Sequence, residues 1–168
     1  MNKLSYFLSL VFLTMAMGVM AQAPTGTPDA NYSIYKNKLK KSEEGLTDAK
    51  KNITPKFWIS RAELMMDIFE LHRKFISPGT QELHVNLIYQ NPSETRDSVG
   101  ADGSNYKFLV FEKITIRLKD GVVESFKETV KLYETPLPEA LKCLEKAQEL
   151  DVEGKSAKDF KLLIFEDE

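Results

Sequence analysis

The sequence predicts an α+β protein, mainly helical, in which a small antiparallel β-sheet lies between two long helices. Apolar residues recur at helical spacing over residues 55–76 and again over residues 137–150. Between these segments, residues 106–133 are rich in β-branched and aromatic side chains and contain an Asp-Gly turn signal at 120–121. A hairpin is therefore expected there, or three strands if residues 84–89 join it.

The N-terminal residues have the features of a secretory signal peptide over residues 1–23. Lys3 precedes an uncharged apolar run, and Ala21-Gln22-Ala23 has the small-x-small pattern of a cleavage site. The apolar run is short for a membrane span of about 20 residues. We expect cleavage after Ala21 or Ala23, which implies a periplasmic or secreted protein with no stable membrane insertion after cleavage.

The remaining chain is expected to be a flexible tether over residues 24–32, followed by a single domain over residues 33–168. Pro, Gly and Thr dominate the start of the tether. A short helix is expected over residues 33–44, ended by Gly45. Its lysines are diluted by acidic residues, and the net charge is only −2. We therefore expect a solvated helix face and no nucleic-acid partner, since nucleic-acid binding requires a strong basic patch.

Both long helices are predicted to begin at a Thr-Pro pair. The hydroxyls of Thr54 and Thr135 can accept from an orphan N–H, and proline is tolerated in the first helical turn. The first helix is apolar over a wide face, which predicts burial between neighbours. We expect it to continue to residues 77–79 (Ser-Pro-Gly), with His72 as a packed core residue. The second helix is expected to end before Gly154.

The segment between the helices is expected to form strands and one long loop. Residues 84–89 (HVNLIY) are a strand candidate, and residues 91–105 are polar enough to predict a mobile loop. Residues 106–119 alternate from Phe111 onward, and residues 122–133 can return as the partner strand. Because an isolated hairpin is marginally stable, the sheet must pack on the helices or on another chain.

The sequence contains no pattern typical of an active site. It lacks HExxH, CxxC, a glycine-rich phosphate loop and GxSxG. Cys143 is the only cysteine, which excludes an intramolecular disulfide, and it is expected to be a small apolar helix residue. We predict no catalytic residue, no cofactor and no metal site, and therefore a protein that is not an enzyme.

The two long helices together resemble a tetratricopeptide (TPR) repeat that has been split. In the first helix, Trp58, Ala62 and Met65 match the family's aromatic, small and tyrosine positions. In the second, Ala140, Leu144 and Ala147 match its alanine, aromatic and alanine positions. Met65, Leu144 and Val152 depart from the tyrosine, the aromatic and the turn proline of the family.

The spacing of these residues is the larger departure from the family. Trp58 and Ala140 are 82 positions apart (140 − 58), whereas the usual repeat has 34 residues, so residues of about 80–134 are a β insertion. Residues 38–46 (KLKKSEEGL) and the segment Asp48-Ala49-Lys50-Lys51 precede the helix that contains Trp58. In this order the N-terminal part is similar to exported TPR proteins of Bacteroidetes-type bacteria.

The resemblance implies a non-enzymatic scaffold that mediates protein–protein interaction in the cell envelope. A single repeat cannot bury both faces of its helices, so other elements or a protein or peptide partner must complete it. The candidate partner surface comprises Phe69, Phe108 and Phe111. The alternative is a small α+β structural or binding domain of the periplasm, unrelated to TPR, in which the sheet carries the function.

One short motif is a candidate modification site. Asp97-Ser98-Val99 is similar to the Asp-Ser/Thr-aliphatic acceptor of O-glycosylation in exported Bacteroidetes proteins. It lies in the segment expected to be a loop, so Ser98 is a candidate for O-glycosylation.

Overall fold

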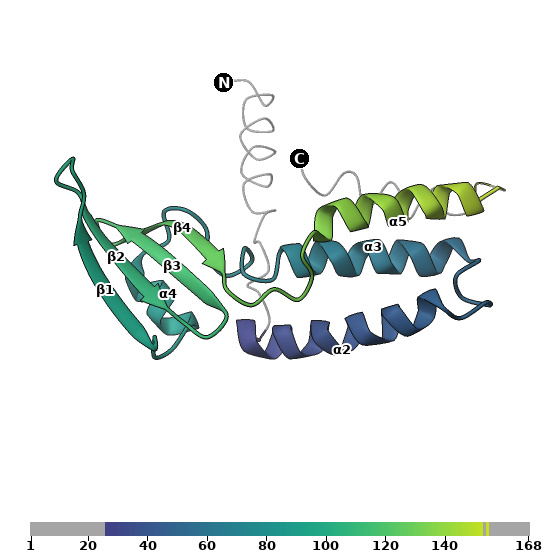
Figure 1. Cartoon of the computed structure of the whole chain (residues 1–168), viewed down its shortest axis with the longest axis horizontal. Helices are drawn as coiled ribbons and strands as arrows, with labels where there is room; N and C mark the ends of the chain where they lie inside the picture. Colours follow the sequence, from purple (N-terminus) through teal and green to yellow (C-terminus); the bar gives the residue numbers. More distant parts are fainter. Residues whose placement is uncertain (1–25, 153, 155–168) are drawn as a thin grey trace, which may run out of the picture.

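A computed structural model describes residues 26–152 and residue 154. The predicted signal peptide therefore lies outside the described residues. The described chain has two lobes (Figure 1): a layer of three helices, and a four-stranded antiparallel sheet with one short helix packed on it. The α+β class predicted from the sequence is confirmed. None of the described helices is long and apolar enough to cross a membrane.

The helical layer contains α2 (Pro28–Leu46), α3 (Pro55–Phe69) and α5 (Pro136–Leu150), with α3 in the middle. Helices α3 and α5 run antiparallel, although the whole sheet separates them in sequence (Figure 1). Ala62 and Met65 of α3 are buried against Ala140 and Cys143 of α5. The residues expected to pack in this pair are therefore buried or partly buried: Trp58, Ala62, Met65, Ala140, Leu144 and Ala147.

Arg61 links all three helices of the layer, and its side chain is only 1% exposed. Its Nη2 lies 2.8 Å from Glu43 Oε1 on α2 and 3.1 Å from Glu139 Oε1 on α5. Its Nη1 donates to Ser42 Oγ at 2.9 Å. Burial alone would lower the pKa of Arg61, but the hydrogen bonds to Glu43 and Glu139 raise it overall. The guanidinium therefore stays charged, with both carboxylates in contact.

The sheet is a meander of four strands in the order β1-β2-β3-β4. The strands are β1 (Glu94–Val99), β2 (Asn105–Val110), β3 (Ile114–Lys119) and β4 (Val122–Glu128). The predicted turn at residues 120–121 joins β3 to β4, and both of its residues have positive φ, as a tight hairpin turn requires. One face of the sheet, including Leu109, Ile116 and Leu118, forms a core with Val85 and Tyr89.

Helix α2 begins earlier than the short helix expected over residues 33–44. Thr27 caps it, because Thr27 Oγ1 accepts a hydrogen bond from the Ala30 N–H at 3.2 Å, and Pro28 occupies the first turn. The expected tether is thus helical from Pro28 onward. Gly45 does not end this helix. A Cβ at Gly45 would lie 2.4 Å from the Phe57 ring, so glycine permits the close approach of the following helix.

The second expected helix ends at Phe69, not at residues 77–79. Residues 70–76 form successive turns, held for example by the Ile76 N–H donating to the His72 carbonyl at 3.1 Å. These turns direct Ile76 into the core of the sheet lobe. Neither Thr54 nor Thr135 makes the expected cap with its side chain. Thr54 Oγ1 instead donates to the Lys51 carbonyl at 2.8 Å.

The strand expected at residues 84–89 is wrong, because these residues belong to α4 (Glu82–Ile88) and its C-terminal end. Val85, Ile88 and Tyr89 fall three and four positions apart and face the sheet. Leu83 and Leu87 are 66% and 65% exposed. A short apolar run fits a strand or a helix equally well by pattern, and packing on the sheet decides between them.

The prediction of a loop over residues 91–105 is also wrong, because these residues contain β1 and the start of β2. All six residues of β1 are exposed, so no apolar alternation marks the strand in the sequence. The single strand expected over residues 106–119 is interrupted at Phe111, whose N–H donates to the Ile114 carbonyl at 2.9 Å. The sheet therefore has four strands instead of two or three.

We expect Arg61→Ala to lower the free energy of unfolding by about 3 kcal/mol, because it leaves Glu139 partly buried without its partner. Equilibrium urea unfolding followed by circular dichroism measures this change. Lys146→Ala is the control, since it breaks an exposed pair with Glu149 (2.7 Å) and should change the same quantity by less than about 0.5 kcal/mol. Equal effects of the two variants would contradict a structural role for Arg61.

Candidate functional site

Metal-ligating side chains are not gathered in the described part of the chain. No group of three or more His, Cys, Asp or Glu residues there could hold a metal ion. Cys143 is buried against α3, and burial raises the pKa of its thiol to about 11. At neutral pH this thiol is protonated and shielded, so it behaves as the apolar helix residue that the sequence indicated.

A cavity of about 670 Å³ lies where the two lobes meet. Its walls come from the start of α2, the turns after α3, the C-terminal end of α4 and the β2–β3 turn. His72 lines it and is 3% exposed, and its Nδ1 lies 2.7 Å from Tyr89 Oη. Burial lowers the pKa of His72 to about 4, so the imidazole is neutral at pH 7.

The protonation of this buried pair follows from its hydrogen bonding. Burial raises the pKa of Tyr89, so its phenol keeps its proton. If Tyr89 donates to His72 Nδ1, only the Nε2–H of His72 lacks an acceptor among the described residues. If His72 donates instead, both His72 Nε2 and the phenol proton of Tyr89 lack a partner in the part of the chain that the structure describes. The first arrangement is therefore favoured, because each buried polar group without a partner costs about 1–3 kcal/mol.

Charged groups at the rim of the cavity are paired across elements. Lys113 Nζ in the β2–β3 turn lies 2.9 Å from Asp29 Oδ1 at the start of α2 and 3.3 Å from Glu112 Oε2. The same ammonium lies 5.2 Å from the centroid of the Tyr32 ring. These contacts and the His72–Tyr89 pair join the helical lobe to the sheet lobe. We interpret the cavity as part of this joint, because the Lys113–Asp29 and His72–Tyr89 contacts beside it connect the two lobes.

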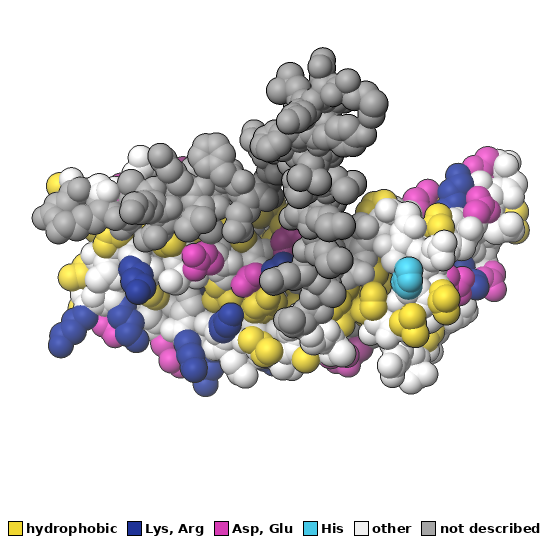
Figure 2. Space-filling model, turned by 180° about the vertical axis from the view of Figure 1, so that it is seen from behind, with side chains coloured by type: hydrophobic (Ala, Val, Ile, Leu, Met, Phe, Trp, Pro, Cys, Tyr) yellow, Lys and Arg dark blue, Asp and Glu magenta, His cyan; other side chains and the backbone are white. Residues whose placement is uncertain are grey.

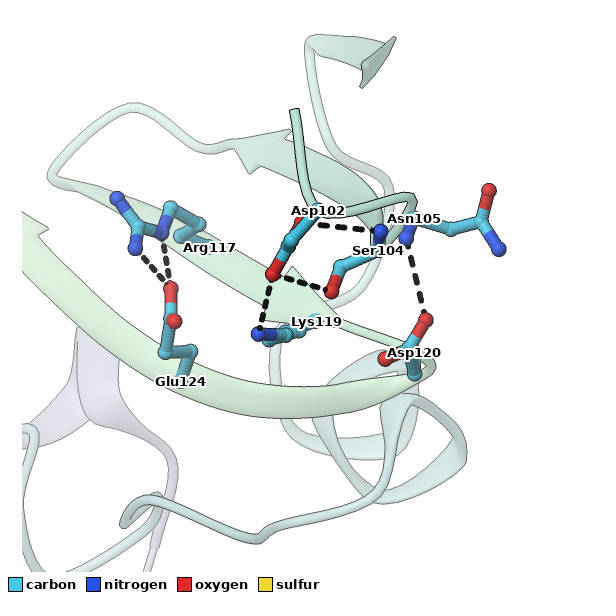
Figure 3. Close-up of polar contacts among 7 residues, drawn as sticks. All are labelled: Asp102, Ser104, Asn105, Arg117, Lys119, Asp120 and Glu124. Carbon is cyan, nitrogen blue, oxygen red and sulfur yellow. Dashed lines mark hydrogen bonds and ion pairs between the residues drawn. The ribbon is translucent and has the colours of Figure 1, made fainter. Parts of the chain in front are cut away.

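The face of the sheet opposite α4 carries aromatic and charged side chains at the surface. Figure 3 shows Arg117 paired with Glu124 and Lys119 paired with Asp102. The distance from Lys119 Nζ to Asp102 Oδ2 is 3.3 Å. The Tyr106 ring lies between the two cations, at 5.2 Å from the Arg117 guanidinium and 5.6 Å from the Lys119 ammonium. Each cation is neutralised by a carboxylate, which disfavours the binding of a polyanion.

The three phenylalanines predicted to form a partner surface lie in separate places. Phe69 is half-buried, with the Arg73 guanidinium 3.9 Å from its ring centroid. Phe108 is half-buried on the sheet face opposite α4. Phe111 is 9% exposed and packs in the sheet core, where its ring centroid is 5.3 Å from that of Tyr89. The prediction that Phe111 belongs to a partner surface is therefore wrong.

The candidate acceptor Ser98 is exposed, as a modification site requires, but it lies in the edge strand β1 and not in a loop. Its modification stays a prediction.

The sequence reasoning missed two exposed features. Leu137 and Leu141 lie on the outer side of α5 and are 44% and 59% exposed. Hydrophobic side chains also reach the surface of the sheet lobe seen from behind (Figure 2), and Leu83 and Leu87 of α4 are among the exposed ones of this lobe. The spacing of 137 and 141 was a usable signal, since both belong to an apolar arc too wide for one neighbouring helix.

No protein-family model, curated protein or solved structure matches the chain.

We expect the stability of the protein to fall as the pH decreases from 6.5 to 4. The folded state binds a proton at His72 less readily than the unfolded state, whose pKa is 6.5, so protonation favours unfolding. The His72 contribution lost across this window is about 3 kcal/mol. This contribution to the free energy of unfolding is fully present above pH 6.5. Urea unfolding at a series of pH values measures it.

The double variant His72→Phe/Tyr89→Phe should lose this part of the pH dependence. It removes both polar partners together, which costs little at pH 7. His84→Gln, at an exposed position, controls for the loss of a histidine and should keep the wild-type profile. A profile of the double variant that coincides with wild type would show that His72 does not cause the acid sensitivity.

Proposed function

We propose that this protein is an exported, non-enzymatic, TPR-like protein that binds another protein in the cell envelope. The outer side of α5 is the contact surface. Export rests on the signal-peptide pattern of residues 1–23, and the TPR likeness rests on the residue pattern of the two long helices. The observation that carries the proposal is that α5 has more apolar surface than α3 covers.

The arrangement of the helix pair supports a TPR-like packing. Helix α3 covers the side of α5 that carries Ala140, Cys143 and Ala147, and small side chains there allow the two backbones to approach closely. This is the role that the alanines of a TPR repeat would have. In arrays of such repeats, the next helix packs on the second helix of each pair.

The outer side of α5 is where such a next helix would pack. Leu137 and Leu141 are separated by one helical turn, and partly buried Leu144 lies between them and the covered side. Exposed apolar stripes on a helix are typical of surfaces that receive a partner helix or an apolar groove. We therefore place the partner contact at Leu137 and Leu141.

Site-specific photo-crosslinking from position 141 tests this proposal. A photoreactive amino acid replaces Leu141 in the full chain, which is expressed with its signal peptide, and the adduct is identified by mass spectrometry. We expect an adduct with a discrete second protein, and we expect Leu137→Lys to reduce its yield at least tenfold. The same amino acid at Lys146, which is exposed and lies on a different side of α5, about 140° around the helix from Leu141, is the control and should give no such adduct.

Two results would contradict the proposal. One is an adduct from position 141 that joins only peptides of this chain within one molecule, since the surface would then be covered internally. The other is an unchanged adduct after Leu137→Lys in a variant whose thermal unfolding matches wild type.

A further inference from the structure

Strand β1 is an edge strand, and its outer side has no neighbouring strand in the described residues. All six of its residues are exposed. The other edge of the sheet is different, because residues 79–81 cover the start of β4. The Gly79 N–H donates to the Val123 carbonyl at 2.7 Å, and the Val123 N–H donates to the Thr80 carbonyl at 2.7 Å. Only the β1 edge therefore presents a full strand for pairing within the described sheet.

The direction of the backbone groups of β1 follows from its register with β2. Glu94, Arg96 and Ser98 face Val110, Phe108 and Tyr106. Gly100 and Ser104 continue this series of facing pairs, and the Gly100 N–H donates to the Ser104 carbonyl at 2.8 Å. This pair is therefore a hydrogen-bonded one. Because hydrogen-bonded pairs alternate in an antiparallel ladder, the backbones of the even-numbered residues point to β2. The N–H and C=O groups of Thr95, Asp97 and Val99 therefore point outward.

We propose that β1 pairs with β1 of a second copy of this chain, antiparallel and about a two-fold axis at Thr95. The two Thr95 residues then exchange a pair of backbone hydrogen bonds. On each side of them the Asp97 N–H faces the Ser93 carbonyl of the second copy. The two sheets join into one eight-stranded sheet, with α4 of both copies on the same face. This inference uses a surface separate from α5 and does not depend on the proposed function.

The charges of β1 select this register. A two-fold axis perpendicular to the sheet places one residue opposite its own copy, because residues directly opposite each other share a face. With Thr95 at the centre, Glu94 lies opposite Arg96 of the second copy, and this happens twice. Centring the pair on Glu94, Arg96 or Asp97 would place like charges directly opposite, which is destabilising.

The present contact of these residues fits the paired state. Arg96 Nε lies 3.1 Å from Glu94 Oε1 in the same strand, and both side chains are more than half exposed. In the dimer the two glutamates and two arginines form a square of alternating charge. Each Arg96 would then contact its own Glu94 and that of the second copy, so no new desolvated charge is left unpaired.

The α4 side of the edge supplies apolar surface to the same contact. A groove of about 640 Å³ runs beside β1 and is lined by Leu87, Thr95 and Leu109, among others. Leu87 of α4 is 65% exposed. A two-fold axis at Thr95 brings the Leu87 side chains of both copies to the same side of the joined sheet. Burial of these leucines is an apolar contribution that backbone pairing alone lacks.

Sedimentation equilibrium of the mature chain with a charge-swap set tests the proposal. We expect a reversible monomer–dimer equilibrium for wild type. Arg96→Glu and Glu94→Arg each place like charges opposite and should weaken association at least tenfold. The double variant Glu94→Arg/Arg96→Glu restores opposite charges at both positions and should recover association to within about threefold of wild type.

A proline pair tests the register through the backbone. Thr95→Pro removes an outward N–H at the centre of the contact while leaving the bonds to β2, and should abolish the dimer. Val99→Pro removes an outward N–H beyond the paired residues and should leave the dimer unchanged. Circular dichroism reports whether each variant keeps the wild-type fold.

Several results would overturn the proposal. A wild-type chain that stays monomeric at millimolar concentration excludes self-pairing. A dimer that tolerates Arg96→Glu and Thr95→Pro uses another surface. A double charge-swap variant that associates no better than the single variants shows that Glu94 and Arg96 do not face each other.

Discussion

The helical layer depends on one buried cation. Apolar contacts hold α3 against its neighbours, but they are not directional and do not fix which side of α2 and α5 faces α3. Arg61 fixes these sides, because burial of its guanidinium is favourable only when Glu43 and Glu139 both pair with it. Glu139 follows Arg61 by 78 positions, so the contact closes a loop that contains the entire sheet. Both ends of the sheet lobe must therefore leave the layer at the same end, which Figure 1 shows.

The joint between the lobes begins where α3 ends. If the helix had continued through residue 76, His72 and Ile76 would extend its apolar stripe and the sheet would lack part of its core. Instead, the turns after Phe69 direct Ile76 into the sheet core and His72 against Tyr89. The paired imidazole and phenol are apolar enough to be buried and polar enough to fix one geometry. The Lys113–Asp29 pair then ties the start of α2 to the β2–β3 turn. Three chain segments that are distant in sequence thus meet at one place.

The sequence predicts the elements in which apolar residues recur at a regular spacing. It misses the elements that form only through contacts with segments distant in sequence. The helices containing Trp58 and Leu144 and the turn at Asp120 were predictable, because periodicity, prolines and a two-residue turn act within a few residues. Strand β1 has no buried residue, so only its pairing with β2 makes it a strand. Helix α4 is shorter than the length at which periodicity distinguishes helix from strand. The burial of Arg61 could not be predicted, since nothing near it in sequence indicates its two carboxylate partners.

The exposed character of β1 is therefore informative about function as well as prediction. A strand at the edge of a sheet that contributes nothing to the core has one of two roles: it prevents other strands from pairing with the sheet, or it provides a site where another strand pairs. Protection works through like charges that repel a second strand in every register. In β1 the signs alternate, with Glu94, Arg96 and Asp97 within four positions, so repulsion is strong in some registers and replaced by attraction in one. An edge of this kind selects its partner strand by register, and the strand that it matches best is a copy of itself.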